Sequence, residues 1–354
     1  MINKESVRQY ILNLFGTKAR DVQISKLGEG VQGAGFLVDI TTEEGSTHYV
    51  VKGLFPEGLE HDYPADRAGV FLLDLDEFGH LPNHVRALDV LAELEDGSIK
   101  SIGGGKEYYL LMERAEGRHY FNDLAAMRKK SSIDKNDIAK IKIMTSYLAD
   151  IHSVKKDSEQ LYWRKVRDTI GHGECLMGVF DTYPEGTVTA EEITVIEKKC
   201  VDWRARLKPK FKRLCQVHGD FHPGNIWFQD DNKLVLLDRS RGPWGDAADD
   251  LTALTMNYIF FSINNSGKVQ DAFYDALKLF YDEYVTITGD SEVFEVVAPF
   301  YAFRGAVVAN PVFYPDVTLE NRRRIFRFIN GVLDDESFKV EKVNQYIKNK
   351  KSRL

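Results

Sequence analysis

The sequence has little of what marks several large classes of protein. Its only cysteines, Cys175, Cys200 and Cys215, are widely spaced and form no Cys-x-x-Cys pair, which argues against a disulfide framework and against a structural zinc site. It has no N-terminal apolar leader segment and no apolar run of about 18 residues that would span a membrane. We therefore expect a soluble, cytoplasmic protein without a membrane partner.

Positive charge is not in excess either. Against 47 Lys and Arg residues the chain has 54 Asp and Glu residues, which gives a net charge of −7. Without a global basic field, nucleic acid is not an expected partner. The 354 residues, 43% of them hydrophobic, can bury a large core and suffice for about two domains.

What the sequence does contain is a set of polar groups at fixed intervals. Asn225 follows Asp220 by five residues, and Asp238 follows it by eighteen, at the end of the apolar run 234–237. Phosphoryl transfer leaves the protein little covalent chemistry, so a hydroxyl has to be positioned and phosphate charge neutralised. A carboxylate can accept a hydroxyl proton, while an amide oxygen and a second carboxylate are hard ligands for Mg²⁺. The spacing therefore predicts Asp220 as the base or hydroxyl orienter and Asn225 and Asp238 as metal ligands.

These residues also carry a family resemblance. His218, Gly219 and Asp220 together with Asn225 resemble the HGDxxxxN motif of the aminoglycoside phosphotransferase and choline kinase-like family, which is related to the protein kinases. The segment 245–251, Gly-Asp-Ala-Ala-Asp-Asp-Leu, is similar to the GDPxxDLA segment that follows the metal-binding Asp in that family.

The resemblance implies an α+β, bilobal, protein kinase-like fold. A small antiparallel-sheet N-lobe (1–116) would bind the nucleotide, and a larger, mostly helical C-lobe (117–354) would carry the catalytic loop, the metal site and the acceptor pocket. The backbone of a hinge at Glu113 and Ala115 would hydrogen-bond the purine. The implied cofactors are ATP or GTP and Mg²⁺, and the implied acceptor is a small aminoglycoside-, sugar- or amino-alcohol-like molecule with a hydroxyl group.

A glycine-rich stretch supplies the candidate nucleotide site. Gly28, Gly30 and Gly33 form a Gly-x-Gly-x-x-Gly pattern, followed by the alternating apolar run 36–40. In a dinucleotide-binding βαβ unit the glycines would open a helix, whereas here a strand follows. The pattern favours a hairpin over the phosphates, because a side chain would block the approach of backbone N–H groups; a plain glycine-rich hairpin is the alternative. The next predicted strand ends at Lys52, which the resemblance places on the α- and β-phosphates.

In the same family frame, an acid on a helix should pair with Lys52. Asp66, in the first turns of a helix predicted at 64–79, is preferred over Glu60 and Asp62. An Asp is shorter than the Glu usual at this place.

The residues after the metal-binding aspartate depart from the family pattern. Arg239 and Arg241 stand where an aromatic residue and an acid are expected, and they would bring positive charge beside the phosphates or an anionic acceptor, unless they are solvated surface residues. Asp246, Asp249 and Asp250 are expected to cap the next helix and to tie down the catalytic loop through backbone N–H groups.

Apolar periodicity predicts the remaining elements. Strands are expected at 85–94 and 107–113. Helices are expected at 4–15, 64–79, 134–153, 250–263, 268–287, 292–308, 318–333 and 336–350. The segment 158–205 is expected to help build the acceptor pocket, with the turn 171–174 as an acceptor-binding corner or a simple helix break.

Two other interpretations remain open. A dinuclear metallophosphoesterase also clamps ions with carboxylates and imidazoles, but it would want an Asp-x-His upstream and a Gly-Asn-His run, and Asn225 is followed by Ile226. A kinase fold that has lost its chemistry and keeps nucleotide or partner binding is the second alternative, against which the three polar groups argue.

Overall fold

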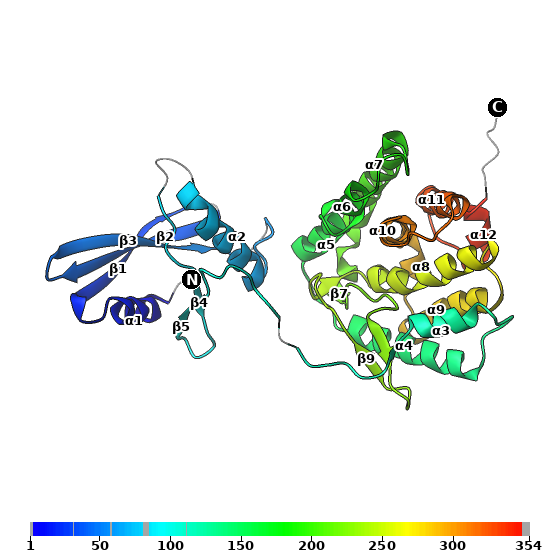
Figure 1. Ribbon diagram of the computed structural model, residues 1–354, viewed down its shortest axis with the longest axis horizontal. Helices are drawn as coiled ribbons and strands as arrows, with labels where there is room; N and C mark the ends of the chain where they lie inside the picture. Colours follow the sequence, from blue (N-terminus) through cyan, green and yellow to red (C-terminus); the bar gives the residue numbers. More distant parts are fainter. Residues whose placement is uncertain (1–2, 31, 57–58, 81–84, 111, 349–354) are drawn as a thin grey trace. The chain divides into compact units, whose positions relative to one another are not determined.

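The computed structural model describes residues 3–30, 32–56, 59–80, 85–110 and 112–348. The chain divides into two units, Met1–Met112 and Glu113–Leu354, which can be followed along the sequence colours in Figure 1. The division lies four residues before the boundary expected after residue 116.

Unit 1 contains a three-stranded antiparallel sheet in the order β1-β2-β3 and a helix, α1, that precedes it. These elements are α1 (Lys4–Phe15), β1 (Ala19–Glu29), β2 (Gly33–Thr42) and β3 (Gly45–Leu54). Helix α1 has the predicted bounds. It begins after Asn3, whose side chain accepts the Ser6 N–H at 3.2 Å, and it ends at Gly16, where φ is 55° and a residue without Cβ is favoured.

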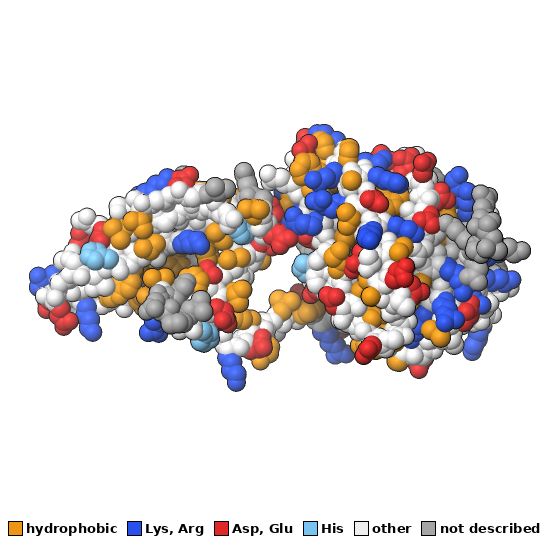
Figure 2. Space-filling model, turned by 90° about the horizontal axis from the view of Figure 1, so that it is seen from above, with side chains coloured by type: hydrophobic (Ala, Val, Ile, Leu, Met, Phe, Trp, Pro, Cys, Tyr) orange, Lys and Arg blue, Asp and Glu red, His pale blue; other side chains and the backbone are white. Residues whose placement is uncertain are grey.

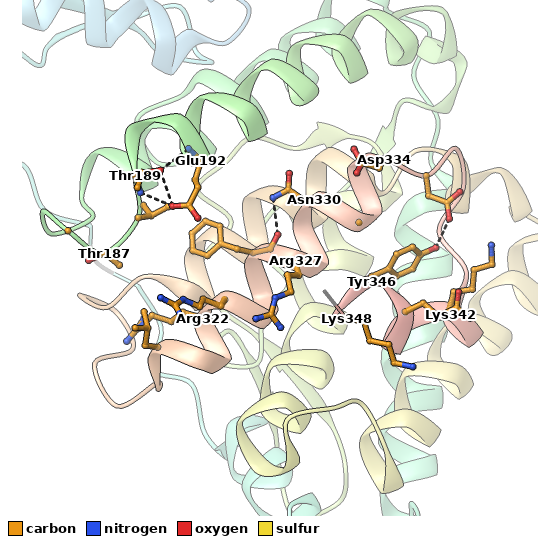
Figure 3. Close-up of a pocket in the computed structure, with 18 of the residues that line it drawn as sticks. Thr187, Thr189, Glu192, Arg322, Arg327, Asn330, Asp334, Lys342, Tyr346 and Lys348 are labelled. Atoms are coloured by element: carbon orange, nitrogen blue, oxygen red, sulfur yellow. Dashed lines mark hydrogen bonds between the residues drawn. The ribbon is translucent and has the colours of Figure 1, made fainter. Parts of the chain in front are cut away.

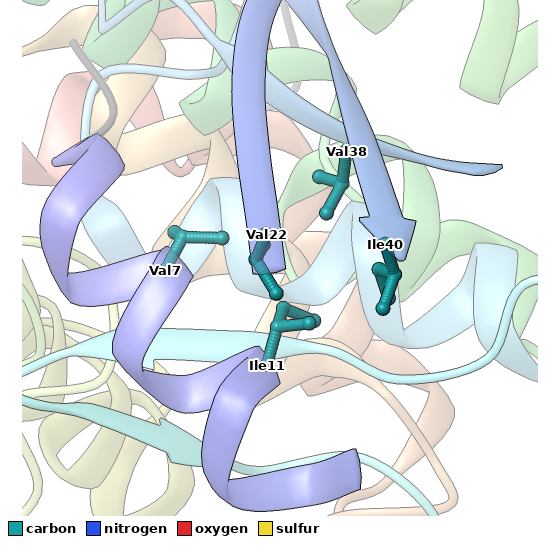
Figure 4. Packing of buried hydrophobic residues seen from close by; sticks show 5 residues of the cluster. All are labelled: Val7, Ile11, Val22, Val38 and Ile40. Carbon is teal, nitrogen blue, oxygen red and sulfur yellow. The ribbon is translucent and has the colours of Figure 1, made fainter. Parts of the chain in front are cut away.

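A small core holds α1 against the sheet. It consists of Val7 and Ile11 from the helix, Val22 from β1, and Val38 and Ile40 from β2, and Figure 4 shows these side chains facing one another. The helical pair is four residues apart and the β2 pair two residues apart, which are the spacings that place side chains on one face of each element.

The rest of unit 1 has less regular structure than expected. Helix α2 (Pro64–Glu77) covers most of the helix predicted at 64–79. The strand predicted at 85–94 is reduced, among the described residues, to β4 (Leu91–Glu93), which pairs with β5 (Ile99–Ser101).

The strand predicted at 107–113 is wrong for the residues of that range that the structure describes, and Leu111 lies outside them. Tyr109 is 89% exposed and Leu110 is 85% exposed, so this apolar run is not buried against a neighbour. A strand needs a partner for its N–H and C=O groups. The apolar composition alone therefore misled the prediction.

Unit 2 is mostly helical. Its helices are α3 (Phe121–Met127), α4 (Lys135–Ser153), α5 (Glu159–Gly171), α6 (Leu176–Asp181), α7 (Ala190–Leu207), α8 (Ala247–Ser266), α9 (Asp271–Thr288), α10 (Ala298–Ala309), α11 (Leu319–Leu333) and α12 (Val343–Tyr346). Its short strands are β6 (Arg118–His119), β8 (Ile226–Phe228) and β9 (Leu234–Leu236), which form one sheet, and the pair β7 (Cys215–Gln216) and β10 (Trp244–Gly245).

Helix α8 is deeply buried in this unit. Every residue from Ala247 to Ile263 is buried, as expected for a helix surrounded by others, and α8 packs against α9 and α10 (Figure 1). Its first turn nevertheless carries Asp249 and Asp250. Buried carboxylates are costly unless they are paired, so these two mark a place where function or structure requires charge.

Two predicted helices in unit 2 differ from the structure. The one predicted at 292–308 is interrupted, and α10 begins only at Ala298, with Pro299 in its first turn, where the missing N–H is tolerated. In the described part of 336–350, a short 3₁₀ turn and α12 replace the predicted helix. Irregular backbone there lets Phe338 donate its N–H to Phe294 O at 2.8 Å and bury its ring 4.9 Å from that of Tyr301.

The surface carries both signs of charge. On the face shown in Figure 2, Lys and Arg side chains are interspersed with Asp and Glu over unit 2. None of the described helices combines the length and apolar composition that crossing a membrane requires.

Candidate active site

The predicted catalytic residue lies in the loop between β7 and β8. Strand β7 pairs with β10, which leads directly into α8, and β8 lies between β6 and β9, so each end of the loop joins a paired strand of unit 2. Asp220 is 7% exposed. The preceding Gly219 has φ of 87°, a conformation that L side chains rarely adopt, which explains the glycine of the motif on structural grounds.

Asp250 anchors this loop from the first turn of α8. Its carboxylate accepts the backbone N–H groups of His218 at 2.8 Å and Gly219 at 2.7 Å. The ring of His152 lies on its other side, with Nε2 3.1 Å from Asp250 Oδ2 and Nδ1 2.9 Å from the hydroxyl of Tyr284. The expectation that an acid of this segment ties down the loop is confirmed, and Asp246 is likewise found as the N-cap of α8.

The two oxygens of Asp220 have different surroundings. Oδ1 accepts from Arg241 Nη1 at 3.0 Å and also from Arg304 Nη1. Oδ2 lies 4.0 Å from Nε2 of His222, beyond direct hydrogen-bonding distance. Because His222 Nδ1 accepts the Gly224 N–H at 3.1 Å, a neutral His222 carries its proton on Nε2, facing Asp220.

The environment keeps Asp220 ionised. Burial alone would raise the pKa of this carboxyl, but the charges of Arg304 and then Arg241 outweigh burial and hold the pKa below its ordinary value. The same carboxyl is thus available as a hydrogen-bond acceptor at neutral pH.

Arg304 and Lys165 are the residues that sequence reasoning missed. Arg304, on α10, donates to Gly219 O at 2.9 Å and to Asp249 Oδ1 at 2.8 Å, and Lys165 Nζ, on α5, lies 2.5 Å from Asp249 Oδ2. Burial alone would raise the pKa of Asp249, but Lys165 and Arg304 bring it down to about 2. No local motif points to either cation, since Arg304 and Asp220 are 84 residues apart in the sequence.

The two predicted metal ligands lie just outside the adjoining ends of two neighbouring strands, β8 and β9. Asn225 directly precedes β8, and its carbonyl oxygen accepts the Leu237 N–H at 3.0 Å, continuing the β8–β9 ladder. Asp238 therefore comes one residue past the point of pairing, and it is exposed, with φ of 55°. The Asn225 side chain donates its amide N–H to Asp220 O at 3.0 Å, which leaves Oδ1 as the atom for a hard cation. The donor set fits Mg²⁺.

The glycine-rich stretch forms the end of the β1–β2 hairpin in unit 1, and the hairpin prediction is confirmed. A Cβ on Gly33 would come within 2.2 Å of Gly53 O on β3, so this glycine is required by the close approach of β3 to β2. A Cβ on Gly28 would meet nothing within 4 Å, and Gly30 donates its N–H to Gly33 O at 2.9 Å. Lys52 lies on β3 opposite Gly35 and is exposed.

The other residues predicted to bind the nucleotide are Asp66, Glu113 and Ala115. Asp66 lies in the first turn of α2, where Oδ2 accepts the Tyr63 N–H at 2.8 Å. The hinge residues Glu113 and Ala115 are in irregular backbone, with Glu113 exposed and Ala115 half-buried.

The turn suggested as an acceptor corner lies near the catalytic loop. Glu174 Oε2 is 4.0 Å from Arg241 Nε, so the turn and the segment after β9 share a polar corner beside Asp220. Arg239 instead donates from Nε to Val217 O at 3.0 Å, which gives it a structural contact.

A separate groove of about 1130 Å³ lies on α11 and α12, with the segment 185–189 along one side. Figure 3 shows its mixture of charged and apolar side chains, including Arg322, Arg327 and Tyr346. It contains none of the predicted site residues.

The fold and the loop geometry define a class. The chain has a small antiparallel-sheet unit joined to a helical unit, and an ionised aspartate lies in a loop that leads to an asparagine and a strand-end aspartate. This arrangement is typical of a kinase-like phosphotransferase with an alcohol group as acceptor. The chain belongs to the Phosphotransferase enzyme family, whose model matches residues 32–285. The resemblance seen in the sequence is thereby confirmed, as is the kinase-like fold, and nucleotide binding goes with it.

Several solved structures are similar to this chain at low identity. Amicoumacin kinase hAmiN, in complex with AMP-PNP, Ca²⁺ and Ami, is 12% identical, with 97% of this chain and 100% of that chain covered and a TM-score of 0.42. Aminoglycoside phosphotransferase APH(4)-Ia with ADP and hygromycin B is 14% identical, with 93% and 98% covered and a TM-score of 0.38. Choline kinase from Streptococcus pneumoniae is 15% identical, with 93% and 98% covered and a TM-score of 0.35. No curated protein sequence matches.

Proposed function

We propose that this protein is a Mg²⁺-dependent kinase that transfers the γ-phosphoryl group of ATP or GTP to a hydroxyl of a small aminoglycoside-, sugar- or amino-alcohol-like acceptor. The observation that carries the proposal is the state of Asp220, a carboxylate kept ionised by Arg304 and Arg241 with Oδ2 turned away from both. Such a group can receive a hydrogen bond from an acceptor hydroxyl.

In the proposed reaction, the acceptor hydroxyl donates to Asp220 Oδ2, and its oxygen attacks the γ-phosphorus. The bond from the γ-phosphorus to the bridging oxygen breaks, the electron pair leaves with the nucleoside diphosphate, and the hydroxyl proton passes to Asp220. Asn225 Oδ1 and the Asp238 carboxylate would hold Mg²⁺, which when bound neutralises phosphate charge.

We assign the nucleotide to the glycine-rich hairpin, to Lys52 and to the backbone at Glu113 and Ala115. Gly28, Gly30 and Gly33 would let the phosphates come close to the backbone of this hairpin, and Lys52 would add its charge, with Asp66 as its ion-pair partner. The space beside Gly28 supports this, because no atom of the described residues lies within 4 Å of a Cβ built there. The backbone of the hinge, at Glu113 and Ala115, would bind the purine.

The geometry of the Asp220 site argues against the two alternative functions. A non-catalytic binding module has no use for an ionised Asp220 followed along the chain by two potential metal ligands. A dinuclear metallophosphoesterase needs a cluster of ligands, and no group of three or more His, Cys, Asp or Glu side chains that could hold a metal occurs among the described residues.

The proposal is tested by nucleotide turnover across an acceptor panel. Purified protein is incubated with ATP or GTP and Mg²⁺ together with aminoglycosides, choline, ethanolamine, sugars or homoserine. Acceptor-dependent release of the nucleoside diphosphate, with a phosphorylated acceptor detected by mass spectrometry, is the expected result. Nucleotide binding without transfer to any acceptor would favour the non-catalytic module.

Replacing Asp238 by asparagine is expected to raise the Mg²⁺ concentration needed for half-maximal rate by about 10-fold or more, because a charged hard ligand is lost. The measurement is a Mg²⁺ titration of the initial rate. Asp230→Asn, an exposed change in the β8–β9 turn, is the control and should leave the titration unchanged. An equal Mg²⁺ requirement in wild type and Asp238→Asn would remove Asp238 from the metal site.

A further inference from the structure

We propose that Arg304 is a positioning residue for phosphoryl transfer, which holds Oδ1 of Asp220 and thereby presents Oδ2 to the acceptor hydroxyl. The inference rests on the proposed function, and it assigns a role to a side chain outside the catalytic motif and outside residues 32–285, to which the family model matches.

The contacts of Arg304 are those of a clamp on the catalytic loop. Its guanidinium donates to Asp220 Oδ1, to Gly219 O at 2.9 Å and to Asp249 Oδ1 at 2.8 Å. It therefore contacts both the side chain of the catalytic residue and the backbone of the residue before it. Arg304 is 5% exposed, so water does not compete strongly for these bonds.

The clamp is held in turn by a second buried cation. Asp249, in the first turn of α8, receives Arg304 on one oxygen and Lys165 on the other. Charges thus alternate along Lys165, Asp249, Arg304, Asp220 and Arg241, and each anion lies between two cations. The members on α5, α8 and α10 come from regular helices, which fix a side chain better than a loop can.

The chemistry explains why an arginine is used. A planar guanidinium offers several N–H donors in a fixed fork, so one group can hold a carboxylate, a carbonyl and a second carboxylate together. A lysine ammonium at the same place supplies the charge but not the planar arrangement. Charge and geometry can therefore be separated by mutation.

The different surroundings of the two Asp220 oxygens determine which oxygen the acceptor hydroxyl can reach. With two arginines on Oδ1 and His222 Nε2 at 4.0 Å from Oδ2, Oδ2 is the oxygen left for the acceptor hydroxyl. Without Arg304 the carboxylate can rotate toward Arg241, and the reacting hydroxyl loses its partner. A displacement of about 1 Å can cost about 100-fold in rate.

The test compares Arg304→Met and Arg304→Lys with a matched control, Arg322→Met. Arg322 is also a buried arginine, 6% exposed, but it donates to the backbone oxygens of Ala309 and Tyr314. Arg304→Met is expected to lower kcat by about 100-fold with the KM for nucleotide changed less than about twofold, since Arg304 is assigned no contact with nucleotide. Arg304→Lys should recover part of kcat, and Arg322→Met should lower the midpoint of thermal unfolding with kcat retained.

Two results would overturn the inference. One is a kcat for Arg304→Met that equals wild type, or that falls no further than in Arg322→Met. The other result comes from crystallography and needs no acceptor. It is the finding that the Asp220 carboxylate has the same orientation in crystal structures of wild type and Arg304→Met. If wild-type protein transfers phosphate to no acceptor, the proposed function fails, and the structural comparison still decides whether Arg304 orients Asp220.

Discussion

Asp220→Asn is expected to lower kcat by about 100- to 10,000-fold, the range over which a positioned general base or hydroxyl orienter acts. Asparagine keeps the shape of the side chain but cannot take a proton from the acceptor. It also removes the negative charge that lies between Arg304 and Arg241, so the amide would be drawn to present its oxygen to them and its N–H₂ group to the acceptor. The measurement is the initial rate of acceptor phosphorylation under saturating nucleotide and Mg²⁺.

Loss of the charge at Asp220 also affects stability, and the assay has to separate the two effects. Leaving two buried or half-buried arginines without the negative charge between them is expected to cost about 1–3 kcal/mol of unfolding free energy. Rates are therefore compared at a temperature where the unfolding curves show both proteins folded, with Asp202→Asn on the exposed side of α7 as the control. A folded Asp220→Asn protein with wild-type kcat would contradict the proposed role.

The part of the site that could be predicted from sequence is the part that is local. Asp220, Asn225 and Asp238 lie within one loop and one hairpin, where chain spacing alone limits how far apart they can be. The structure adds the reason for the spacing, because the β8–β9 register places Asn225 opposite Leu237. Their roles as base and metal ligands stay predictions until the mutants are measured.

The long-range part of the site could not be predicted. Arg304 reaches Asp220 only because α10 packs against α8, and Lys165 reaches Asp249 from α5. A single arginine in an apolar helix and a single lysine in an amphipathic one carry no periodic signal that distinguishes them from surface residues. A buried acid such as Asp249 was the available hint, since an anion in the first turn of a buried helix needs a cation from elsewhere.

The helices of the fold were predicted better than its short strands and irregular segments. The bounds of α1 and α4 agree with the apolar periodicity, whereas the apolar run 107–113 suggested a strand that the described residues do not form. Helical periodicity reports a property of one segment, but a strand depends on a neighbour that the segment itself cannot specify. The error at 336–350 has a related cause, because Phe338 packs among distant aromatic rings.

Asp250→Asn is expected to be the most damaging change outside the catalytic residue. One carboxylate oxygen accepts the Gly219 N–H, and the other accepts the His218 N–H and faces His152. An amide can offer only one oxygen, so its N–H₂ group must face a backbone N–H. The site is fully buried, and an unsatisfied donor pair there is expected to cost about 2–4 kcal/mol of unfolding free energy.

The same change should also loosen the loop that carries Asp220, so kcat is expected to fall by about 100-fold in protein that is still folded. The matched control is Asp137→Asn, which alters another buried carboxylate, in the capping box of α4, where it accepts the Asp134 N–H at 3.0 Å. That variant should lose stability and keep kcat, because the Asp137 carboxylate contacts Lys130 and the backbone of Asp134 at the start of α4. Chemical denaturation and initial rates measured on both variants decide the matter: if Asp250→Asn lost stability but kept wild-type kcat, the anchor would serve only folding, and the position of Asp220 would depend on Arg304 and Arg241.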